Sequence, residues 1–293
     1  MILVVGGTGA LGSCTVGKLV AAGHHVRVLN RGITPRTQTP WDESIEYVTG
    51  DVRVPESLTV AFDSVDLVVS AMHGFAGTGG NSPATVDRDG NLNLIAAAER
   101  AGAEVLLLSV VRAAKDSPME LFRMKWVAEQ RLRASGAPWT IVRATAFAET
   151  WIGLREQTAG RSGRPLVFGR GDNPINFVSI DDVANVVVRA ATDQTQRGKT
   201  LILGGPRNLT MNELAAAVQV RNGWAGSPKH VPRAMLRAMR GMGAVAPKIG
   251  RQAAAALAMD TIDLGFDPAV DGTAYADLPP TDISRQTRSA REA

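Results

Sequence analysis

Three glycines near the N-terminus have the spacing of a phosphate-binding turn. The segment GGTGALG places Gly6, Gly9 and Gly12 three residues apart, directly after the apolar run ILVV. Glycine permits a tight turn and close backbone approach to a pyrophosphate, and a following helix offers free N–H groups and a positive dipole end. The pattern predicts a dinucleotide site contacted by the loop residues Gly6, Thr8, Gly9, Ala10, Leu11 and Gly12.

The end of the second predicted strand indicates which dinucleotide is bound. NAD-selective sites place a carboxylate there for the ribose 2′-hydroxyl, about 20 residues past the glycines. Here Asn30 and Arg31 occupy the position. A guanidinium pairs with a 2′-phosphate, and Arg36 could assist from the next loop, so NADP(H) is favoured over NAD(H). The alternative is an ordinary surface arginine after a strand.

The sequence SAMHG follows the fourth predicted strand, at the carboxyl edge where parallel sheets bind ligands. Ala71 and Met72 are therefore expected to line the cofactor. His73 could contact a ligand or face solvent.

Positioning these residues requires alternating strands and helices. Apolar runs rich in β-branched residues predict strands buried on both faces, and amphipathic stretches between them predict helices. The expected fold class is α/β, a Rossmann doubly wound parallel sheet with a smaller, mostly helical C-terminal substrate-binding part. Strands are expected near residues 2–5, 25–31, 45–51, 66–72, 104–111, 139–145 and 199–205; helices are expected near 10–23, 56–63, 83–101 and 118–135.

The chain is expected to divide into a cofactor domain and a smaller part. Residues 1–150 form the predicted NADP(H)-binding Rossmann domain, whose sheet and helices continue to about 205. Residues 151–270 form the predicted substrate-cleft part, and the polar stretch 271–293 is expected to be a flexible tail.

The composition is typical of a globular protein and gives no sign of a nucleic-acid or membrane partner. Hydrophobic residues make up 45% and charged residues 20% of 293 positions, a globular balance. The net charge of +4 is small and scattered, so no nucleic-acid partner is expected. No apolar run is long enough to span a bilayer, and no membrane partner is expected.

The single cysteine, Cys14, excludes an internal disulfide and a cysteine-based metal cluster, and no metal site is expected. Cys14 near the start of a helix is a packing residue or a reactive thiol, and packing is favoured. Without an N-terminal targeting pattern, a cytoplasmic location is expected.

Several motifs together resemble the atypical short-chain dehydrogenase/reductase superfamily, in its NmrA-like NAD(P)H-binding branch. They are VVGGTGALG, VRVLNRG, GDV, DGNLNLIAAAERAG, LRASGAPWTIVRAT and NFVSIDDVANVVVRAA. The resemblance covers about residues 1–205 well and the tail not at all. It implies a Rossmann fold, bound NADP(H) and a substrate cleft in the C-terminal part. Members include reductases and also co-regulators that bind dinucleotide without turnover, so fold transfers more safely than activity.

The resemblance also assigns roles to single residues. Asp51, followed by Val52, is placed to accept from the adenine amino group. Thr145 is expected near the nicotinamide. Ser109, at the end of a predicted strand, matches the family's catalytic serine position, although a serine ending a strand needs no such role.

Lys125 matches the lysine of the superfamily's Tyr-x-x-x-Lys pair, but Leu121 stands where the tyrosine is expected. The resemblance implies that Lys125 holds the nicotinamide ribose. Without it, Lys125 reads as a solvated helix lysine paired with Glu129 at i+4. Leucine cannot donate a proton, so any reaction must proceed without a tyrosine acid.

Two functions fit these residues best; a sugar-nucleotide epimerase or dehydratase is ranked last, because that chemistry usually needs the tyrosine. The favoured one is an NADPH-dependent oxidoreductase that transfers hydride to a small conjugated or aromatic acceptor such as a quinone. The alternative is a non-catalytic NADP(H)-sensing regulator that binds a protein partner. A homodimer is compatible with either.

Overall fold

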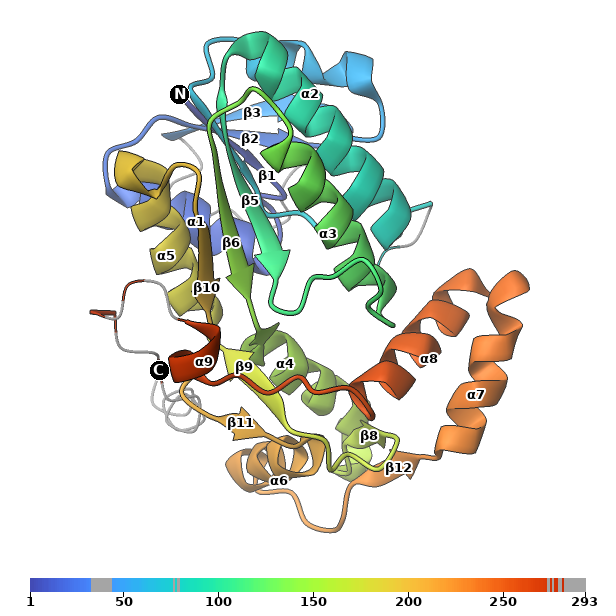
Figure 1. The fold of residues 1–293 in the computed structure, drawn as a ribbon. Helices are drawn as coiled ribbons and strands as arrows, with labels where there is room; N and C mark the ends of the chain where they lie inside the picture. The colour runs from blue at the N-terminus through green and yellow to red at the C-terminus, as the bar shows by residue number, and fades with distance from the viewer. Residues whose placement is uncertain are drawn as a thin grey trace. The chain divides into compact units, whose positions relative to one another are not determined.

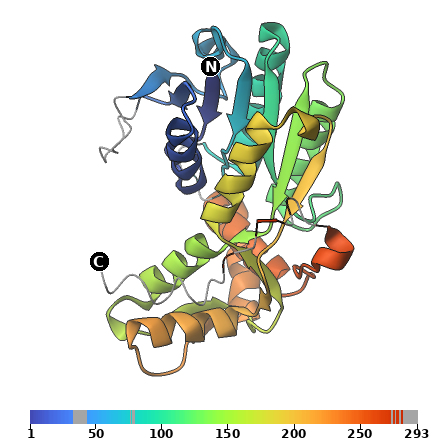
Figure 2. The same cartoon turned by 90° about the vertical axis from the view of Figure 1, so that its left-hand side faces the viewer.

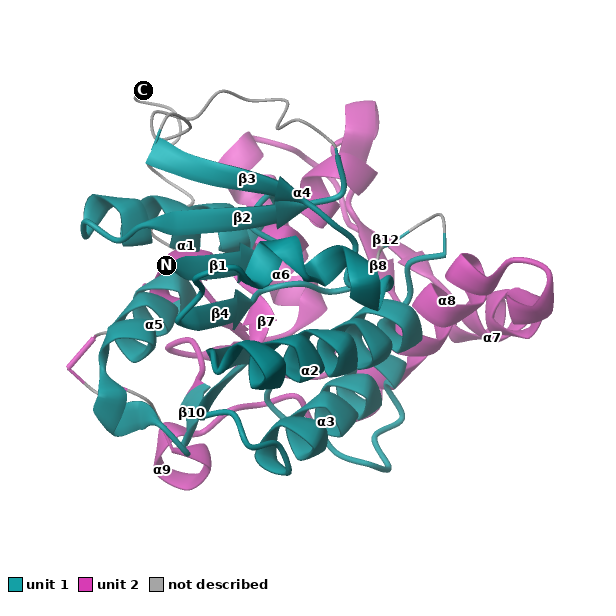
Figure 3. Cartoon of the chain, turned by 90° about the horizontal axis from the view of Figure 1, so that it is seen from above, with its two compact units in different colours: residues 1–143, 183–202 teal, residues 144–182, 203–293 magenta. Residues whose placement is uncertain are grey.

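A computed structural model describes residues 1–32, 44–75, 77, 80–272, 275, 277–278 and 281. The chain forms two compact units that are not contiguous in sequence. Unit 1 comprises residues 1–143 and 183–202, and unit 2 comprises 144–182 and 203–293 (Figure 3). The chain thus leaves unit 1 after 143 and returns at 183. The sequence suggested a boundary near 150, with the sheet and helices of the first domain continuing to about 205. Each unit is described by itself.

Unit 1 is built on a seven-stranded sheet whose order is β10-β6-β5-β4-β1-β2-β3. The pairs β1–β2, β1–β4, β2–β3 and β4–β5 are parallel. The order reverses beside β1, which confirms the expected doubly wound Rossmann sheet. Sheets of this kind bind ligands at the carboxyl ends of their strands. The strands are β1 (Ile2–Val5), β2 (Val26–Asn30), β3 (Ile45–Thr49), β4 (Leu67–Ser70), β5 (Glu104–Val110), β6 (Trp139–Ala144) and β10 (Thr200–Leu203).

Helices cover both faces of this sheet, as right-handed crossovers between parallel strands require. In Figures 1 and 2, α2 (Asn91–Ala101) and α3 (Glu120–Arg133) lie on one face, and α1 (Ala10–Ala21) and α5 (Ile180–Thr192) lie on the other. Helix α2 is followed by Gly102, whose φ of 68° is the left-handed conformation of a glycine C-cap.

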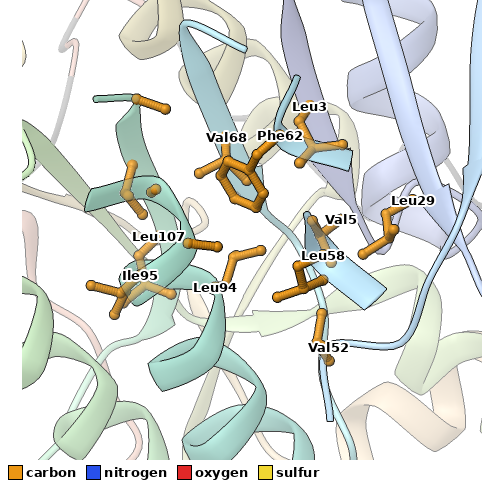
Figure 4. Packing of buried hydrophobic residues seen from close by; sticks show 14 of the residues in the cluster. Leu3, Val5, Leu29, Val52, Leu58, Phe62, Val68, Leu94, Ile95 and Leu107 are labelled. Atoms are coloured by element: carbon orange, nitrogen blue, oxygen red, sulfur yellow. The ribbon is translucent and has the colours of Figure 1, made fainter. Parts of the chain in front are cut away.

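The core of unit 1 is aliphatic, as the low aromatic content of 5% requires. Leu3 and Val68 on the strands are fully buried, as is Leu94 on α2. Figure 4 shows these side chains meeting Phe62 and Leu58 between the sheet and its helical layer. The strand ends are therefore fixed by a close-packed interior.

Two expected helices of unit 1 differ from simple α-helix. The stretch expected as a helix near 56–63 forms two short 3-10 segments, η2 (Pro55–Leu58) and η3 (Val60–Phe62). The β-branched Thr59 and Val60 have low helix propensity and stand where a second α-turn would form. The helix expected over 83–101 begins as a π-helix, η4 (Pro83–Gly90), before becoming α2.

Unit 2 combines short strands with helices. Its strands form two small sheets, β11-β9-β7 and β12-β8. A core around Phe177, Leu214 and Val218 joins the larger sheet to its helices. The short strands interrupt the mostly helical part that the sequence predicts. The elements are β7 (Ala146–Phe147), α4 (Ala148–Ala159), η5 (Gly160–Ser162), β8 (Leu166–Phe168), β9 (Ile175–Val178), β11 (Asn208–Leu209), α6 (Met211–Asn222), β12 (Lys229–Val231), α7 (Arg233–Gly241), η7 (Met242–Ala244), α8 (Pro247–Met259) and α9 (Pro268–Asp271). The expected flexible tail, 271–293, lies largely outside the described residues.

Candidate functional site

The glycine turn has the close backbone packing that only glycine allows. Gly6 has φ of 85°, and a Cβ atom there would lie 2.9 Å from the carbonyl oxygen of Ala71. A Cβ atom on Gly12 would lie 2.0 Å from the carbonyl oxygen of Gly6. These glycines bring the start of α1 directly against the end of β1, as the spacing predicts.

The tip of this turn faces solvent while its base is buried. Thr8, Gly9 and Ala10 are exposed, and Leu11 is buried in the core. Gly9 is the N-cap of α1, with no side-chain cap and no acidic residue in the first turn. An anionic group can therefore meet the N-terminus of α1 without competing with a carboxylate of that turn.

Arg31 and Asn30 end β2, at the neighbouring position of the same sheet edge. Arg31 is exposed, and its Nη1 atom donates to Oδ1 of Asn81 at 3.1 Å. The Asn30 side chain accepts from Gly32 N–H at 2.9 Å, which holds the turn after the strand. Arg31 is thus partly oriented while still facing solvent. Arg36, expected to assist it, lies outside the described residues.

Asp51, expected to bind adenine, is engaged by Arg53. The guanidinium contacts both carboxylate oxygens, with Nε 3.0 Å from each, and the backbone N–H of Arg53 donates to Oδ1 at 2.9 Å. This partner holds the pKa of Asp51 below its ordinary value. Val52 is buried, and its carbonyl accepts from Asn93 at 2.8 Å. An adenine amino group would have to share the carboxylate with Arg53.

Lys125 is buried, with a side chain only 3% exposed. Its Nζ atom donates to the carbonyls of Met72 and Leu108, each at 3.0 Å, and lies 3.1 Å from Oδ1 of Asp87. The ammonium thus donates two hydrogen bonds to backbone carbonyls and forms an ion pair with the buried Asp87 carboxylate. Lys125 is therefore neither a solvated surface lysine nor the i+4 partner of Glu129.

Asp87 was not singled out from the sequence, although it anchors this site. It is fully buried on η4, and its Oδ2 accepts from Gly74 N–H at 2.8 Å. Its backbone carbonyl accepts from Asn91, whose Oδ1 accepts from the Ser70 hydroxyl at 2.7 Å. The motif DRDGN carries no signal that separates Asp87 from Asp89, because only the π-helical geometry turns Asp87 inward.

Ser109 and Glu129 form a second buried group of polar contacts. The Ser109 hydroxyl donates to Oε1 of Glu129 at 2.5 Å. The same carboxylate accepts from Arg143, with Nε at 2.8 Å, and from Arg133, with Nη1 at 3.1 Å. The hydroxyl proton of Ser109 is therefore directed at Glu129. Lys125 belongs to the separate contacts around Asp87.

His73 is the ionisable side chain that follows Ala71 and Met72, the residues expected to line the cofactor after β4. Ala71 continues the sheet, donating its N–H to the Val5 carbonyl at 2.9 Å, and Met72 is buried. The His73 side chain is exposed to solvent. Desolvation lowers its pKa, the charge of Asp87 opposes the shift, and that of Lys125 adds to it.

Thr145 lies in unit 2, just after β6. Its hydroxyl donates to Oδ1 of Asn176 at 2.8 Å, and its N–H donates to the Leu203 carbonyl at 3.1 Å. The role near nicotinamide that the resemblance implies for Thr145 stays a prediction, as do the roles of Lys125, Ser109 and Asp51.

The sheet order and the glycine turn define a dinucleotide-binding Rossmann protein. The NmrA-like family model matches residues 1–259. The chain belongs to the NmrA-like family, as its motifs suggested.

Two relatives are similar to this chain in sequence, and one solved structure is similar to it in fold. The photosystem II assembly factor Ycf39 of Synechocystis is 31% identical over 82% of this chain and 73% of its own length. An NAD(P)H azoreductase of Xenophilus azovorans is 30% identical over 83% of this chain and 82% of its own. The NADPH complex of the quinone oxidoreductase QOR2 from Escherichia coli has a TM-score of 0.75 at 20% identity, covering 98% of both chains.

None of the helices described in the structure is both long and apolar enough to cross a membrane. Within the same described residues, no cluster of three or more His, Cys, Asp or Glu side chains could hold a metal ion.

Proposed function

We propose that this protein is an NADPH-dependent oxidoreductase that transfers hydride to a small conjugated or aromatic acceptor, such as a quinone. One observation carries the proposal. An intact dinucleotide turn stands beside a helix on which Leu121 replaces the acid and Lys125 is engaged by protein groups. Acceptors of this kind need hydride delivery and positioning more than protein acid catalysis.

The cofactor is NADP(H). The residues present fit it: Gly6 and Gly12 leave the backbone accessible where a pyrophosphate is held, and the first turn of α1 carries no acidic residue. Arg31 stands at the end of β2, where a carboxylate would select the unphosphorylated ribose. The azoreductase relative uses NAD(P)H, and the structurally similar quinone reductase binds NADPH. The nicotinamide, when bound, supplies the hydride.

Lys125 supports the reaction by holding the cofactor-facing backbone. Its ammonium fixes the carbonyls of Met72 and Leu108, at the carboxyl ends of β4 and β5. Asp87 holds the ammonium and also the Gly74 N–H. These three contacts hold the ammonium among protein groups, so a ribose hydroxyl would have to share it with them. We infer that it acts mainly as a positioning residue, with its charge close to the site.

The proton that completes the reduction comes from solvent in this scheme. Ser109 directs its own proton to Glu129, and Leu121 has none to give. The exposed imidazole of His73 has a lowered pKa and is neutral at pH 7, so it can relay a proton from water without being required as the acid. Acceptors that form stable anions on reduction suit such a site.

The experiment that tests this proposal is NADPH oxidation with a panel of quinones, enals and azo compounds. Oxidation above the protein-free rate with at least one class is expected. Gly12→Ala serves as the variant that disrupts the cofactor turn and should lose this activity. Failure of the whole panel, with NADPH binding intact, would contradict the proposed reaction.

A second function is favoured by the same Leu121 and by the assembly-factor relative. In it the chain senses NADP(H) and binds a protein partner without turnover. It requires different affinities for NADP⁺ and NADPH, measured by calorimetric titration, and a partner whose capture responds to the cofactor. Equal affinities, together with turnover, would exclude it.

A further inference from the structure

The positive charge of the chain is concentrated in unit 2, between Leu214 and Met259. This stretch holds seven of the 32 Lys and Arg residues and none of the 28 Asp and Glu residues. The remaining 247 positions therefore carry 25 basic and 28 acidic residues, a net charge of −3. The small total of +4 suggested a scattered charge, but the positive charge is concentrated in this stretch.

Helices α7 and α8, joined by η7, form a hairpin within this stretch. Leu236 on α7 packs against Ala253 and Leu257 on α8, and the two helices lie side by side (Figure 1). Gly243 in η7 and Gly250 in α8 allow the two backbone segments to lie in close contact at the turn. A Cβ on Gly250 would lie 2.5 Å from the Gly243 Cα. The hairpin is thus stabilised by packing between the facing sides of its two helices.

Four large apolar side chains of this hairpin face solvent. Met235 is 54% exposed and Met242 is 51% exposed. Met235 lies on α7, and Met242 begins η7 directly after it. Val245 at the turn is 90% exposed, and Ile249 at the start of α8 is 39% exposed. Four such side chains within 15 residues make a patch, which we call the hairpin tip.

Cations without protein partners surround the hairpin tip. Arg237, Arg240 and Lys248 are exposed, and within the described residues none has an ion pair or a hydrogen bond from its side chain. By contrast, Arg233 at the base of α7 is paired with Asp260, its Nε atom 3.2 Å from the carboxylate. The unpaired charges therefore gather where the apolar side chains are exposed.

We propose that the hairpin tip binds the surface of an anionic lipid bilayer. A helix bound in a membrane interface combines apolar side chains that enter the headgroup region with Lys and Arg that meet anionic lipids. Met, Val and Ile insert into lipid but cannot stack on bases, which disfavours nucleic acid. The expectation of no membrane partner rested on the lack of a spanning segment, and surface attachment needs none.

Vesicle flotation tests the inference independently of the proposed reaction. The full chain is mixed with vesicles of phosphatidylcholine alone, or with about one-third phosphatidylglycerol, at low salt. Binding is expected only to the anionic vesicles and should weaken as salt rises, because charged contacts near a surface are screened.

Two variants and one control separate the tip from general charge. Arg237→Glu/Arg240→Glu/Lys248→Glu should weaken binding about 100-fold, since each cation contributes about a fivefold gain near an anionic surface. Met242→Asp/Val245→Asp should also weaken it. The control Arg100→Glu/Lys115→Glu/Arg161→Glu changes exposed cations elsewhere by the same total charge and should retain binding. Thermal melting checks that each variant folds.

Equal binding to neutral and anionic vesicles, or equal loss in the tip and control variants, would overturn the proposal. So would failure to bind either vesicle. Tighter binding to a mixed-sequence DNA or RNA duplex at the same salt, lost in the tip variant, would assign the surface to nucleic acid instead.

Discussion

The Nζ atom of Lys125 lies 3.1 Å from Oδ1 of Asp87, and both side chains are buried. The other carboxylate oxygen accepts from Gly74, while the ammonium donates to the carbonyls of Met72 and Leu108. This pair ties η4 and α3 to the carboxyl ends of two neighbouring strands. The lysine of the family motif is therefore held by protein groups at the carboxyl ends of β4 and β5.

Asp87→Asn should destabilise the protein by about 3–5 kcal/mol, because it leaves the Lys125 charge buried without its counterion. The free energy of unfolding in urea measures this. Asp89→Asn is the matched control, since that carboxylate is about half exposed and pairs with Arg88 at the surface; it should change stability by less than about 1 kcal/mol. Equal effects of the two substitutions would contradict the role of Asp87.

Gly12→Ala should abolish tight NADPH binding, because the new Cβ atom would stand 2.0 Å from the Gly6 carbonyl oxygen and force the turn apart. Gly153→Ala on α4 is the control, since a Cβ there meets no atom within 4 Å. It should leave binding unchanged and raise stability by about 0.5–1 kcal/mol. Calorimetric titration and thermal melting measure both effects, and tight binding by Gly12→Ala would refute the assigned turn.

The sequence could predict this turn because its constraints are local. The glycine spacing, the preceding apolar strand and the following helix lie within about 20 residues. Each can be recognised from neighbouring residues alone. Asp87 could not be predicted, because its burial depends on a π-helical turn and on Lys125, 38 positions away. The same limit applies to Glu129, which the sequence suggested as a partner of Lys125 but which binds Ser109, Arg133 and Arg143.

Arg31→Asp should weaken NADPH binding by about 10- to 100-fold, since a charge-assisted contact contributes roughly 1.5–3 kcal/mol. NADH binding should change little, because it has no 2′-phosphate. Arg100→Asp, at an exposed arginine in the last turn of α2, controls for net charge. Equal losses for NADPH and NADH would show that Arg31 does not read the phosphate.

Leu121→Tyr and Leu121→Phe should support NADPH oxidation at similar rates. The two variants have nearly the same volume and differ in the hydroxyl group alone. If acceptors are reduced without a protein acid at this position, that hydroxyl adds nothing. A steady-state rate many times higher for Leu121→Tyr than for Leu121→Phe would show that proton donation limits the reaction.

His73 should make stability depend on pH in a narrow range. Its folded-state pKa is lowered by desolvation, so the unfolded chain takes up the proton first as pH falls. Stability is then unaffected above a pH of about 6.5 and falls as pH decreases through the folded-state pKa. Urea unfolding of the wild type and His73→Asn between these limits measures the difference. A flat difference across this range would contradict the assigned shift.

The fold of unit 1 was more predictable than that of unit 2. Runs such as ILVV at 2–5 are buried on both faces and leave little choice of structure, so the alternation of strand and helix was read correctly. In unit 2 the strands β7 and β11 have two residues each, too short to produce a periodic pattern. The alanine-rich composition of the C-terminal part suggested helices, so the strand β12 was not predicted. It forms through long-range pairing with β8.

The most direct test of the proposed reaction is the isotope effect on cofactor oxidation. NADPH carrying deuterium at the transferred C4 position is compared with unlabelled NADPH, using an acceptor from the panel under single-turnover conditions. The account predicts acceptor-dependent oxidation that is slower with the deuterated cofactor, because hydride transfer itself is the chemical step. Tight NADPH binding without oxidation by any acceptor would contradict it and favour the sensing function.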